Sequence, residues 1–501
     1  MDQGRGGAAD MTTTTIVGGG IGGLVTALLL SNDPDRKISI YEKKDVLGGR
    51  LTYERHGEFK IDQGPTIVLL PEMLLSILED GGISRDRIPL IPCDPLYNIH
   101  FPDGTTFNKY SDTEKQKAEL KEKFPGNEIH FDRFLSDMRT RFLQGKAQFL
   151  EKSFVDKRTF FSRKNLKTLI KLKAYQNVKK MMRSYFDDER LVEAYTLQTL
   201  YIGGHPEQSP AMYSLVSYSE HEHGIWYMKG GYAHLVEIIE EELEKRGVHI
   251  YKGMPVEGVE TNKDRALSIT AGGEKIKFDE LILNGDFPLM DKVMPAEKQL
   301  QRKYTPSSGC LLLYMGLDRT YENDSIHQFF MSRDFDRHMR QVFVEKQLPD
   351  DPSFYTFHPS LVDPSLAPDG KGVLYTLIPV PTGESVDWGK KDQLIESIID
   401  ELEARGFPGL RKHIEWMHVR TPEDAEREGL FAGGSFGIAP TLFQSGVFRP
   451  QLQPYALGNV YAVGASIHPG GGVPIVMQGA KLLADNLQYG VKERHNYKRG
   501  V

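Results

Sequence analysis

Two glycine-rich turns near opposite ends of the chain have the residue types that bind anions. The first is Gly18-Gly19-Gly20-Ile21-Gly22-Gly23, with the spacing G-x-G-x-x-G, and the second is HPGGGVP, residues 468–474. A glycine turn that opens a helix exposes backbone N–H groups and the positive end of the helix dipole to a phosphate or another anion. Both turns therefore predict backbone contacts with a negatively charged ligand.

The three spaced glycines of the first turn have separate expected roles. Gly18 permits the tight turn, Gly20 lets the backbone approach a pyrophosphate, and Gly23 lets the following helix pack closely on the preceding strand. A lone G-x-G-x-x-G is a weak signal, so the elements around it decide its meaning.

These elements occur in the order that a dinucleotide site requires. Residues 12–17 favour a strand, residues 21–30 favour an apolar helix that must end before Pro34, and residues 38–41 favour a second strand. Glu42 follows about 20 residues after the turn, where a carboxylate accepts hydrogen bonds from ribose hydroxyls. The order predicts a Rossmann-like dinucleotide-binding unit and disfavours a purely structural turn with a chance acid.

Two further turns indicate which dinucleotide binds. Lys43 follows the acid, Gly48-Gly49-Arg50 adds a second backbone-exposing turn with a cation, and Gly64-Pro65-Thr66 closes the series. This series resembles the FAD-binding N-terminus of the flavoprotein amine oxidase and phytoene desaturase superfamily. The resemblance implies that Arg50 lies near the pyrophosphate and that the Gly64-Pro65 turn lies near the flavin.

The middle of the chain contains a strongly basic segment. Residues 157–186 include ten Lys or Arg and no Asp or Glu, in a chain whose formal charge is −7. Apolar residues are interleaved at helical spacing, and a basic amphipathic segment suits an anionic membrane surface. A solvated helix face is the alternative, and a nucleic-acid site is disfavoured because no recognition motif accompanies the charge.

A second αβ unit brings the chain back to the nucleotide domain. The turn at residues 229–231 opens a predicted helix over 232–246, closed by Gly247, and a strand follows at 248–251. In the same superfamily the strand end near Val256 approaches the adenine. A buried strand at 281–283 leads to a polar turn that contains Asp286.

The expected fold is α/β, with a Rossmann-like FAD-binding domain and an inserted α+β substrate domain. The FAD-binding domain takes residues 11–75, 226–305 and 421–495. Residues 76–225 are expected to form a helical substrate and membrane-associating region, and 306–420 a sheet with strands at 311–315 and 373–380.

Longer segments make the resemblance more specific. DQGPTIVLLPE, TLQTLYIGGHPEQSPAMYSLV, FGIAPTLFQSGVFRPQ and GASIHPGGGVPIVMQGAK resemble bacterial carotenoid desaturases of the phytoene desaturase family, above all those acting on thirty-carbon precursors such as 4,4'-diapophytoene. The likeness implies an FAD enzyme that removes two hydrogens per cycle from a linear isoprenoid, by hydride transfer to the flavin and proton loss from the neighbouring carbon. An apolar tunnel would bind such a substrate.

The residues expected to bind FAD combine the turns with the positions that the resemblance implies. They are Gly18, Gly20, Gly23, Glu42, Lys43, Gly49, Arg50, Gly64, Pro65, Thr66, Val256, Asp286, Gly464, His468, Gly471, Gly472, Val473 and Pro474.

No catalytic base can be assigned from the residues. Glu151 and Asp156 flank the basic segment and Asp62 belongs to a family turn, but each is expected to be a surface or structural carboxylate. His468 is expected to be a flavin neighbour and not a proton shuttle. The alternatives to a desaturase are a carotenoid terminal-methyl oxygenase or aldehyde-forming enzyme, a flavin amine oxidase, and an isoprenoid-binding chaperone without flavin.

Composition limits the partners and the compartment. Cys93 and Cys310 have no metal-ligand or redox spacing, so we expect no metal site and a reducing, cytoplasmic environment. No run reaches the roughly 20 apolar residues of a spanning helix, so peripheral association with the inner face of the cell membrane is expected. The sequence is silent on oligomeric state.

Overall fold

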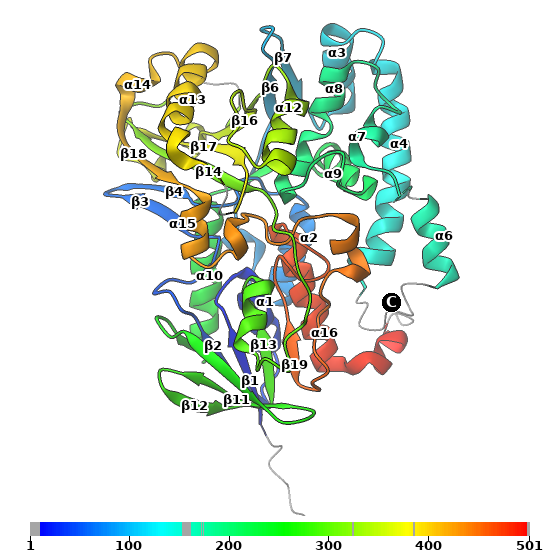
Figure 1. Cartoon of the computed structure of the whole chain (residues 1–501), viewed down its shortest axis with the longest axis vertical. Coiled ribbons are helices and arrows are strands. Elements are labelled where there is room, and N and C mark those ends of the chain that lie inside the picture. Colours follow the sequence, from blue (N-terminus) through cyan, green and yellow to red (C-terminus); the bar gives the residue numbers. More distant parts are fainter. Residues whose placement is uncertain are drawn as a thin grey trace, which may run out of the picture.

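Two large sheets organise the chain, one above the other in the view of Figure 1. The computed structural model describes residues 11–152, 162–171, 173, 175–322, 325–383 and 386–497. Asp156 and residues 157–161 of the basic segment therefore lie outside the described residues.

The lower sheet is the predicted Rossmann-like unit. Its five parallel strands have the order β19-β13-β1-β2-β9, with bounds Val460–Ala462, Glu280–Leu283, Thr12–Val17, Arg36–Tyr41 and His249–Tyr251. The apolar run after the first glycine turn forms α1 (Ile21–Leu30), all of which is buried. It packs against α10 (Gly231–Lys245) and α16 (Val473–Tyr497), so the two glycine turns open neighbouring helices.

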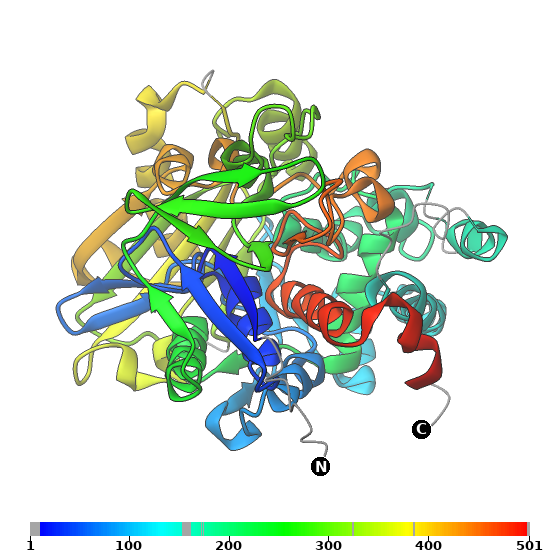
Figure 2. The same ribbon diagram turned by 90° about the horizontal axis from the view of Figure 1, so that it is seen from below.

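A three-stranded antiparallel sheet covers the face of the parallel sheet that lies opposite to α1, as Figure 2 shows. Its strands are β10 (Val256–Thr261), β11 (Ala266–Ala271) and β12 (Glu274–Lys277). Ile269 on β11 is buried in the same apolar core as the parallel strands and α1. The expected FAD-binding architecture is thus present as a three-layer domain.

The upper sheet has seven strands in the order β18-β14-β17-β16-β15-β6-β7. Their bounds are Ile414–Arg420, Gly309–Leu317, Gly372–Val380, Phe354–Phe357, His327–Phe330, Tyr97–His100 and Thr106–Lys109. One face packs against α13 (Lys391–Arg405). The other face is rich in aromatic residues and packs under helices of the middle segment, so the sheet has two separate apolar cores.

The strands β6 and β7 differ from the helical structure expected for this part of the chain. Residues 76–225 are predicted to be helical, yet 97–109 supply two strands of the upper sheet, with β6 parallel to β15. The remaining helices of this region are α2 (Pro71–Asp80), α3 (Thr113–Lys123), α4 (Glu128–Gly145), α6 (Arg163–Lys171), α7 (Val178–Met182), α8 (Glu189–Ala194) and α9 (Leu215–His223). The inserted region and the later sheet strands therefore share one core.

Shorter elements complete the described chain. They are β3 (Tyr53–His56), β4 (Phe59–Asp62), β5 (Leu90–Pro92), β8 (Trp226–Met228), α11 (Phe287–Met290), α12 (Phe335–Arg340), α14 (Leu410–His413) and α15 (Pro422–Arg427).

The described residues of the basic segment fall into two parts with different surroundings. The helix α6 stands away from the body in both views. In α7, by contrast, Val178, Met181 and Met182 are buried in the core. Lys179, expected to face a membrane, is 2% exposed and pairs with Asp336 and Glu189. No helix among the described residues is both long and apolar enough to cross a membrane.

A buried ion pair joins the upper sheet to α9. Lys109 Nζ lies 3.3 Å from Glu220 Oε2, and both side chains are 0% exposed. The same oxygen accepts hydrogen bonds from the Tyr97 hydroxyl at 2.7 Å and from Gln198 Nε2 at 3.2 Å. Burial raises the pKa of Glu220 and lowers that of Lys109, and the attraction between the two charges opposes both shifts.

We expect Lys109→Met to lower the free energy of unfolding by about 3–5 kcal/mol, because it leaves the Glu220 carboxylate buried without a cation. Urea titrations followed by circular dichroism measure this. Lys115→Met is the control, since Lys115 and Asp94 form an exposed pair at 2.8 Å, which water screens, so its loss is expected to leave the stability nearly unchanged. Equal stability of the two variants would contradict the expectation.

Candidate functional site

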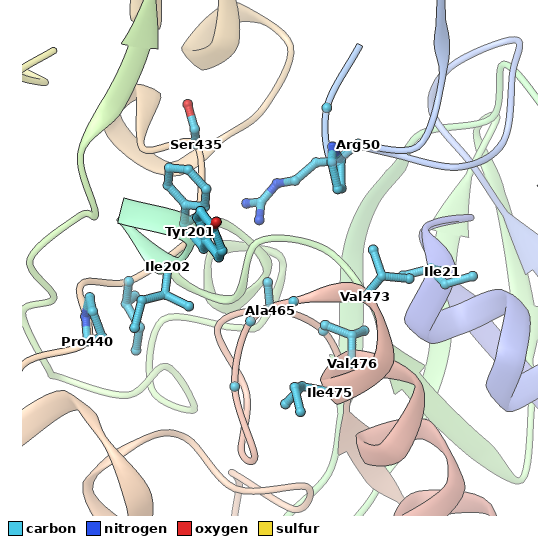
Figure 3. Close-up of a pocket in the computed structure, with 18 of the residues that line it drawn as sticks. Ile21, Arg50, Tyr201, Ile202, Ser435, Pro440, Ala465, Val473, Ile475 and Val476 are labelled. Carbon is cyan, nitrogen blue, oxygen red and sulfur yellow. The ribbon is translucent and has the colours of Figure 1, made fainter. Parts of the chain in front are cut away.

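A single cavity of about 1110 Å³ lies between the two sheets and is lined by both glycine turns. Figure 3 shows Arg50 and Tyr201 reaching into it from different segments, with Val473 and Val476 at the start of α16 close to Ile21 of α1. The inner face of the upper sheet adds an apolar wall that includes Leu312, Phe329 and Leu377. The cavity therefore combines a polar, glycine-rich end with an apolar end.

The first turn has the geometry expected from its glycines. Gly18 has φ of +103°, and a Cβ there would lie 2.1 Å from the Asn284 carbonyl oxygen. A Cβ at Gly23 would lie 2.5 Å from the Gly18 carbonyl oxygen, which confirms that Gly23 serves helix packing. Asn284, which the sequence analysis missed, donates from Nδ2 to the carbonyls of Gly18 at 2.8 Å and Gly20 at 3.0 Å. These bonds hold the turn open toward the cavity.

Glu42 is buried at the end of β2 and is already anchored by backbone groups. Its carboxylate accepts the N–H of Gly19 at 2.7 Å and the N–H of Lys44 at 2.9 Å. A carboxylate oxygen has more than one lone pair, so both oxygens can still accept ribose hydroxyls. Lys43 lines the cavity while its Nζ donates to the Glu428 carbonyl at 2.7 Å.

Asp286 connects three segments around the cavity. Its carboxylate lies 3.2 Å from the Arg50 guanidinium, and accepts the Phe431 N–H at 3.0 Å and the Ser466 hydroxyl at 2.5 Å. Burial lowers the pKa of Arg50, and the charge of Asp286 opposes that shift. Asp286 thus positions Arg50 toward the space where a pyrophosphate is expected.

The second turn leaves room on its cavity side. A Cβ at Gly470 would meet nothing within 4 Å, and a Cβ at Gly471 would have its nearest atom at 3.6 Å. Gly464, Gly472 and Pro474 also line the cavity. This open space in front of the N-terminus of α16 is a cradle that a flavin and its ribityl chain would fill, so these residues fit FAD.

Seventeen of the eighteen expected FAD-binding residues line this one cavity, all except Gly23. Val256, expected near the adenine, and Thr66, expected near the flavin, both line the cavity. Direct contact of each residue with FAD stays a prediction.

Of the carboxylates considered as bases, Asp62 and Glu151 do not reach the cavity, and Asp156 lies outside the described residues. Asp62 accepts the N–H groups of Tyr232 at 2.9 Å and Ala233 at 3.0 Å at the start of α10, and burial raises its pKa to about 7. Neither Asp62 nor Glu151 lines the cavity. His468 does, but its Nε2 donates to the Lys152 carbonyl at 2.8 Å and burial lowers its pKa to about 4, so the ring is neutral.

A hydrogen-bonded chain that the sequence did not predict joins the two domains. Thr66 Oγ1 lies 2.7 Å from the Tyr355 hydroxyl, which lies 2.6 Å from His327 Nδ1. Thr66 and Tyr355 line the cavity, whereas His327 is 0% exposed, and burial lowers its pKa to about 3. The chain places a hydroxyl pair, backed by a neutral imidazole, at the Gly64-Pro65-Thr66 turn.

Two buried arginines of the cavity were also missed. Arg420 lines the cavity and forms a bidentate pair with Glu428, at 3.0 and 2.9 Å. Arg449 lies within FGIAPTLFQSGVFRPQ and is 4% exposed. A single arginine within a run of apolar and small residues gives no signal that its charge is buried.

Comparison with known proteins follows the geometry. The family model described as flavin containing amine oxidoreductase matches residues 21–487. The chain is 58% identical over 468 residues to a 4,4'-diapolycopen-4-al dehydrogenase of Metabacillus indicus, covering 93% of this chain and 95% of the relative. It is 31% identical to a 4,4'-diapophytoene desaturase of Staphylococcus haemolyticus, covering 94% and 97%.

Solved structures share the fold. An oxidoreductase from Methanosarcina mazei superposes with a TM-score of 0.65 at 15% identity, covering 94% of this chain and 99% of that one. A putrescine oxidase in complex with putrescine gives 0.62 at 15% identity, covering 95% and 99%. At this identity the likeness concerns the fold alone.

We expect Gly471→Ala to leave folding intact but to weaken FAD binding roughly tenfold or more, because its methyl group would occupy cofactor space. Gly471 has no positive φ, and the added Cβ meets only ordinary contacts in the protein. Titration of the apoprotein with FAD measures the affinity.

Gly458→Ala is the matched control for this variant. Gly458 also has no positive φ, its added Cβ would lie 3.8 Å from the nearest atom, and it does not line the cavity. Equal FAD affinity of both variants would show that the second turn does not contact the cofactor.

Proposed function

The chain belongs to the flavin-containing amine oxidoreductase family and, within it, to the carotenoid desaturases, and we propose that it oxidises the terminal aldehyde of a linear diapocarotenoid to a carboxylic acid. The protein is an FAD-dependent oxidoreductase. The observation that supports the aldehyde most is the 58% identity to a 4,4'-diapolycopen-4-al dehydrogenase, against 30–32% for the phytoene and diapophytoene desaturases.

The apolar part of the cavity suits the hydrocarbon portion of such a substrate. Its lining includes Tyr201 and Phe142 as well as Ile170 of α6 and Tyr175, which follows α6 in the chain. A polyene has no polar group along its length, so contact area with apolar and aromatic side chains must supply its binding energy.

The polar chain at Thr66 suits an oxygenated terminus. An aldehyde R–CHO adds water to give R–CH(OH)₂, and removal of two electrons and two protons then gives R–COOH. When bound, FAD supplies the two-electron acceptor for this oxidation. Thr66 Oγ1 and the Tyr355 hydroxyl can accept and donate hydrogen bonds to the hydrate, and the neutral His327 Nδ1 can accept a hydrogen bond from the Tyr355 hydroxyl and so orient it.

Desaturation of a 4,4'-diapophytoene-like precursor is the second candidate. It is favoured by the relatives named as desaturases and by the apolar wall, which would accept a hydrocarbon equally well. A terminal-methyl oxygenase needs the same cavity, so its product is what separates it from a dehydrogenase.

We also propose that the cavity opens onto the inner face of the cell membrane beside α6. Ile170 and Tyr175 line the cavity, yet are 66% and 69% exposed, and Leu442, another lining residue, is 47% exposed. Exposed apolar side chains at a tunnel entrance, with Arg163 and Lys167 exposed on the adjoining helix, suit an anionic lipid surface. A substrate dissolved in the bilayer would then enter without crossing water.

We expect the FAD-loaded enzyme to convert 4,4'-diapolycopen-4-al to an acid whose added oxygen comes from water. Parallel reactions in ¹⁸O-labelled water and under ¹⁸O-labelled dioxygen, analysed by mass spectrometry, identify the source. Label from dioxygen would establish an oxygenase. An unreacted aldehyde together with a more conjugated product from 4,4'-diapophytoene would establish the desaturase.

We expect Ile170→Glu to reduce binding to vesicles containing anionic lipid roughly tenfold, because it places a charge where an apolar side chain would enter the membrane. Vesicle flotation measures the bound fraction. Val344→Glu is the matched control, since Val344 is 60% exposed and does not line the cavity. Equal losses in the two variants would locate the membrane contact elsewhere.

A further inference from the structure

Arg50, Arg420 and Arg449 line the cavity, and they differ in how their charges are compensated. Arg50 has Asp286 at 3.2 Å, and Arg420 has Glu428 at 2.9 Å. Arg449 forms no ion pair with any acidic side chain in the described part of the chain. Of these three arginines, Arg449 is therefore the one without a carboxylate partner among the described residues.

The hydrogen bonds of Arg449 go to neutral groups. Its guanidinium donates to the Ala465 carbonyl at 2.5 Å and the Gln444 carbonyl at 3.2 Å, while Nε has no partner among the described residues. Burial lowers the pKa of Arg449, opposed by Tyr213 and the more distant Asp286. A buried guanidinium is costly unless an anion compensates it, and a carboxylate matches its planar donors.

The surroundings of Arg449 add donors for the same kind of ligand. Tyr213 and Ser445 also line the cavity, and their hydroxyls lie 2.9 Å apart. Leu442 and Phe448, from the same loop as Arg449, line the cavity too. A ligand held here would have an anionic group next to Arg449 and an apolar chain in the tunnel.

We propose that Arg449 is the carboxylate-binding residue of the cavity and holds the anionic end of a long-chain polyene acid. The inference rests on the proposed function, since that acid is its product, which Arg449 would hold after it has left the polar chain at Thr66. Negative charge on a reduced flavin is the other source of an anion at this place, so the experiment separates the two.

The test measures binding to the oxidised, FAD-loaded full chain, without turnover. The probe is cis-parinaric acid, a fluorescent polyene carboxylate, compared with its uncharged methyl ester. We expect the wild type to prefer the acid, and Arg449→Gln to weaken acid binding tenfold or more while ester binding stays unchanged. Arg449→Lys keeps the charge without the planar donors and is expected to restore part of the preference.

Arg302→Gln is the matched control for the loop. Arg302 is exposed and donates to the carbonyls of Phe443 and Phe448, but it does not line the cavity. Its acid preference should equal that of the wild type. A measurement that needs no variant is the pH dependence, because the wild-type preference should disappear as the probe's carboxyl becomes protonated.

Three outcomes would overturn the proposal. They are unchanged acid binding by Arg449→Gln, an equal loss of acid and ester, and a shifted flavin midpoint potential with acid binding intact. The last outcome would mean that the positive charge of Arg449 compensates negative charge on the reduced flavin. Because this test measures binding without turnover, its result can be interpreted even if the enzyme does not oxidise the aldehyde.

Discussion

The carboxylate of Asp286 holds together three segments that are far apart in the sequence. It binds Arg50 after the first glycine turn, the Phe431 N–H near α15, and the Ser466 hydroxyl before the second glycine turn. The Asp286 side chain is 1% exposed, so these bonds also compensate a buried charge. The relative placement of the two turns, and therefore the length of the cradle between them, depends on this junction.

The cradle in front of α16 continues into the apolar part of the cavity because the inner face of the upper sheet is lined with aromatic side chains. Tyr355, Tyr375 and Phe329 lie on neighbouring strands and all face inward. Side chains alternate across a strand, so the outer face of the same strands can pack on α13. One sheet thus supplies both a conventional core and a wall for a hydrophobic ligand.

The surface of this cavity is mainly apolar, and the partners of its polar groups explain their roles. The Tyr355 hydroxyl hydrogen-bonds to the Thr66 hydroxyl across the domain boundary and to His327 Nδ1, and Arg420 is neutralised by Glu428. Such satisfied groups orient a ligand at little cost, whereas a buried charge without a carboxylate favours a ligand that brings one. Which ligand the cavity favours therefore depends on whether each polar residue already has a hydrogen-bond or ion-pair partner, and not on the number of polar residues.

Local patterns in the sequence determined the Rossmann-like unit. Gly18, Gly20 and Glu42 follow one another within a single strand-turn-helix-strand stretch, so their spacing alone specified the first turn and its neighbours. The strands around 311–315 and 373–380 were also recognisable, because buried strands are short apolar runs. The second turn at Gly470–Gly472 was identified for the same reason, from glycines that directly precede a helix.

Tertiary structure alone decided which distant residues meet. The strands β6 and β7 lie within a mainly helical stretch, and only the pairing of β6 with β15, and of β7 with β6, makes them strands of the upper sheet. Lys179 has the sequence surroundings of a surface cation, but Asp336 lies 157 residues away in the chain and binds it inside the fold. Arg449 is equally ambiguous, since burial and the absence of a nearby carboxylate are properties of the folded chain. Spacing along a sequence reports contacts within one element, whereas compensation of a charge depends on segments that only folding brings together.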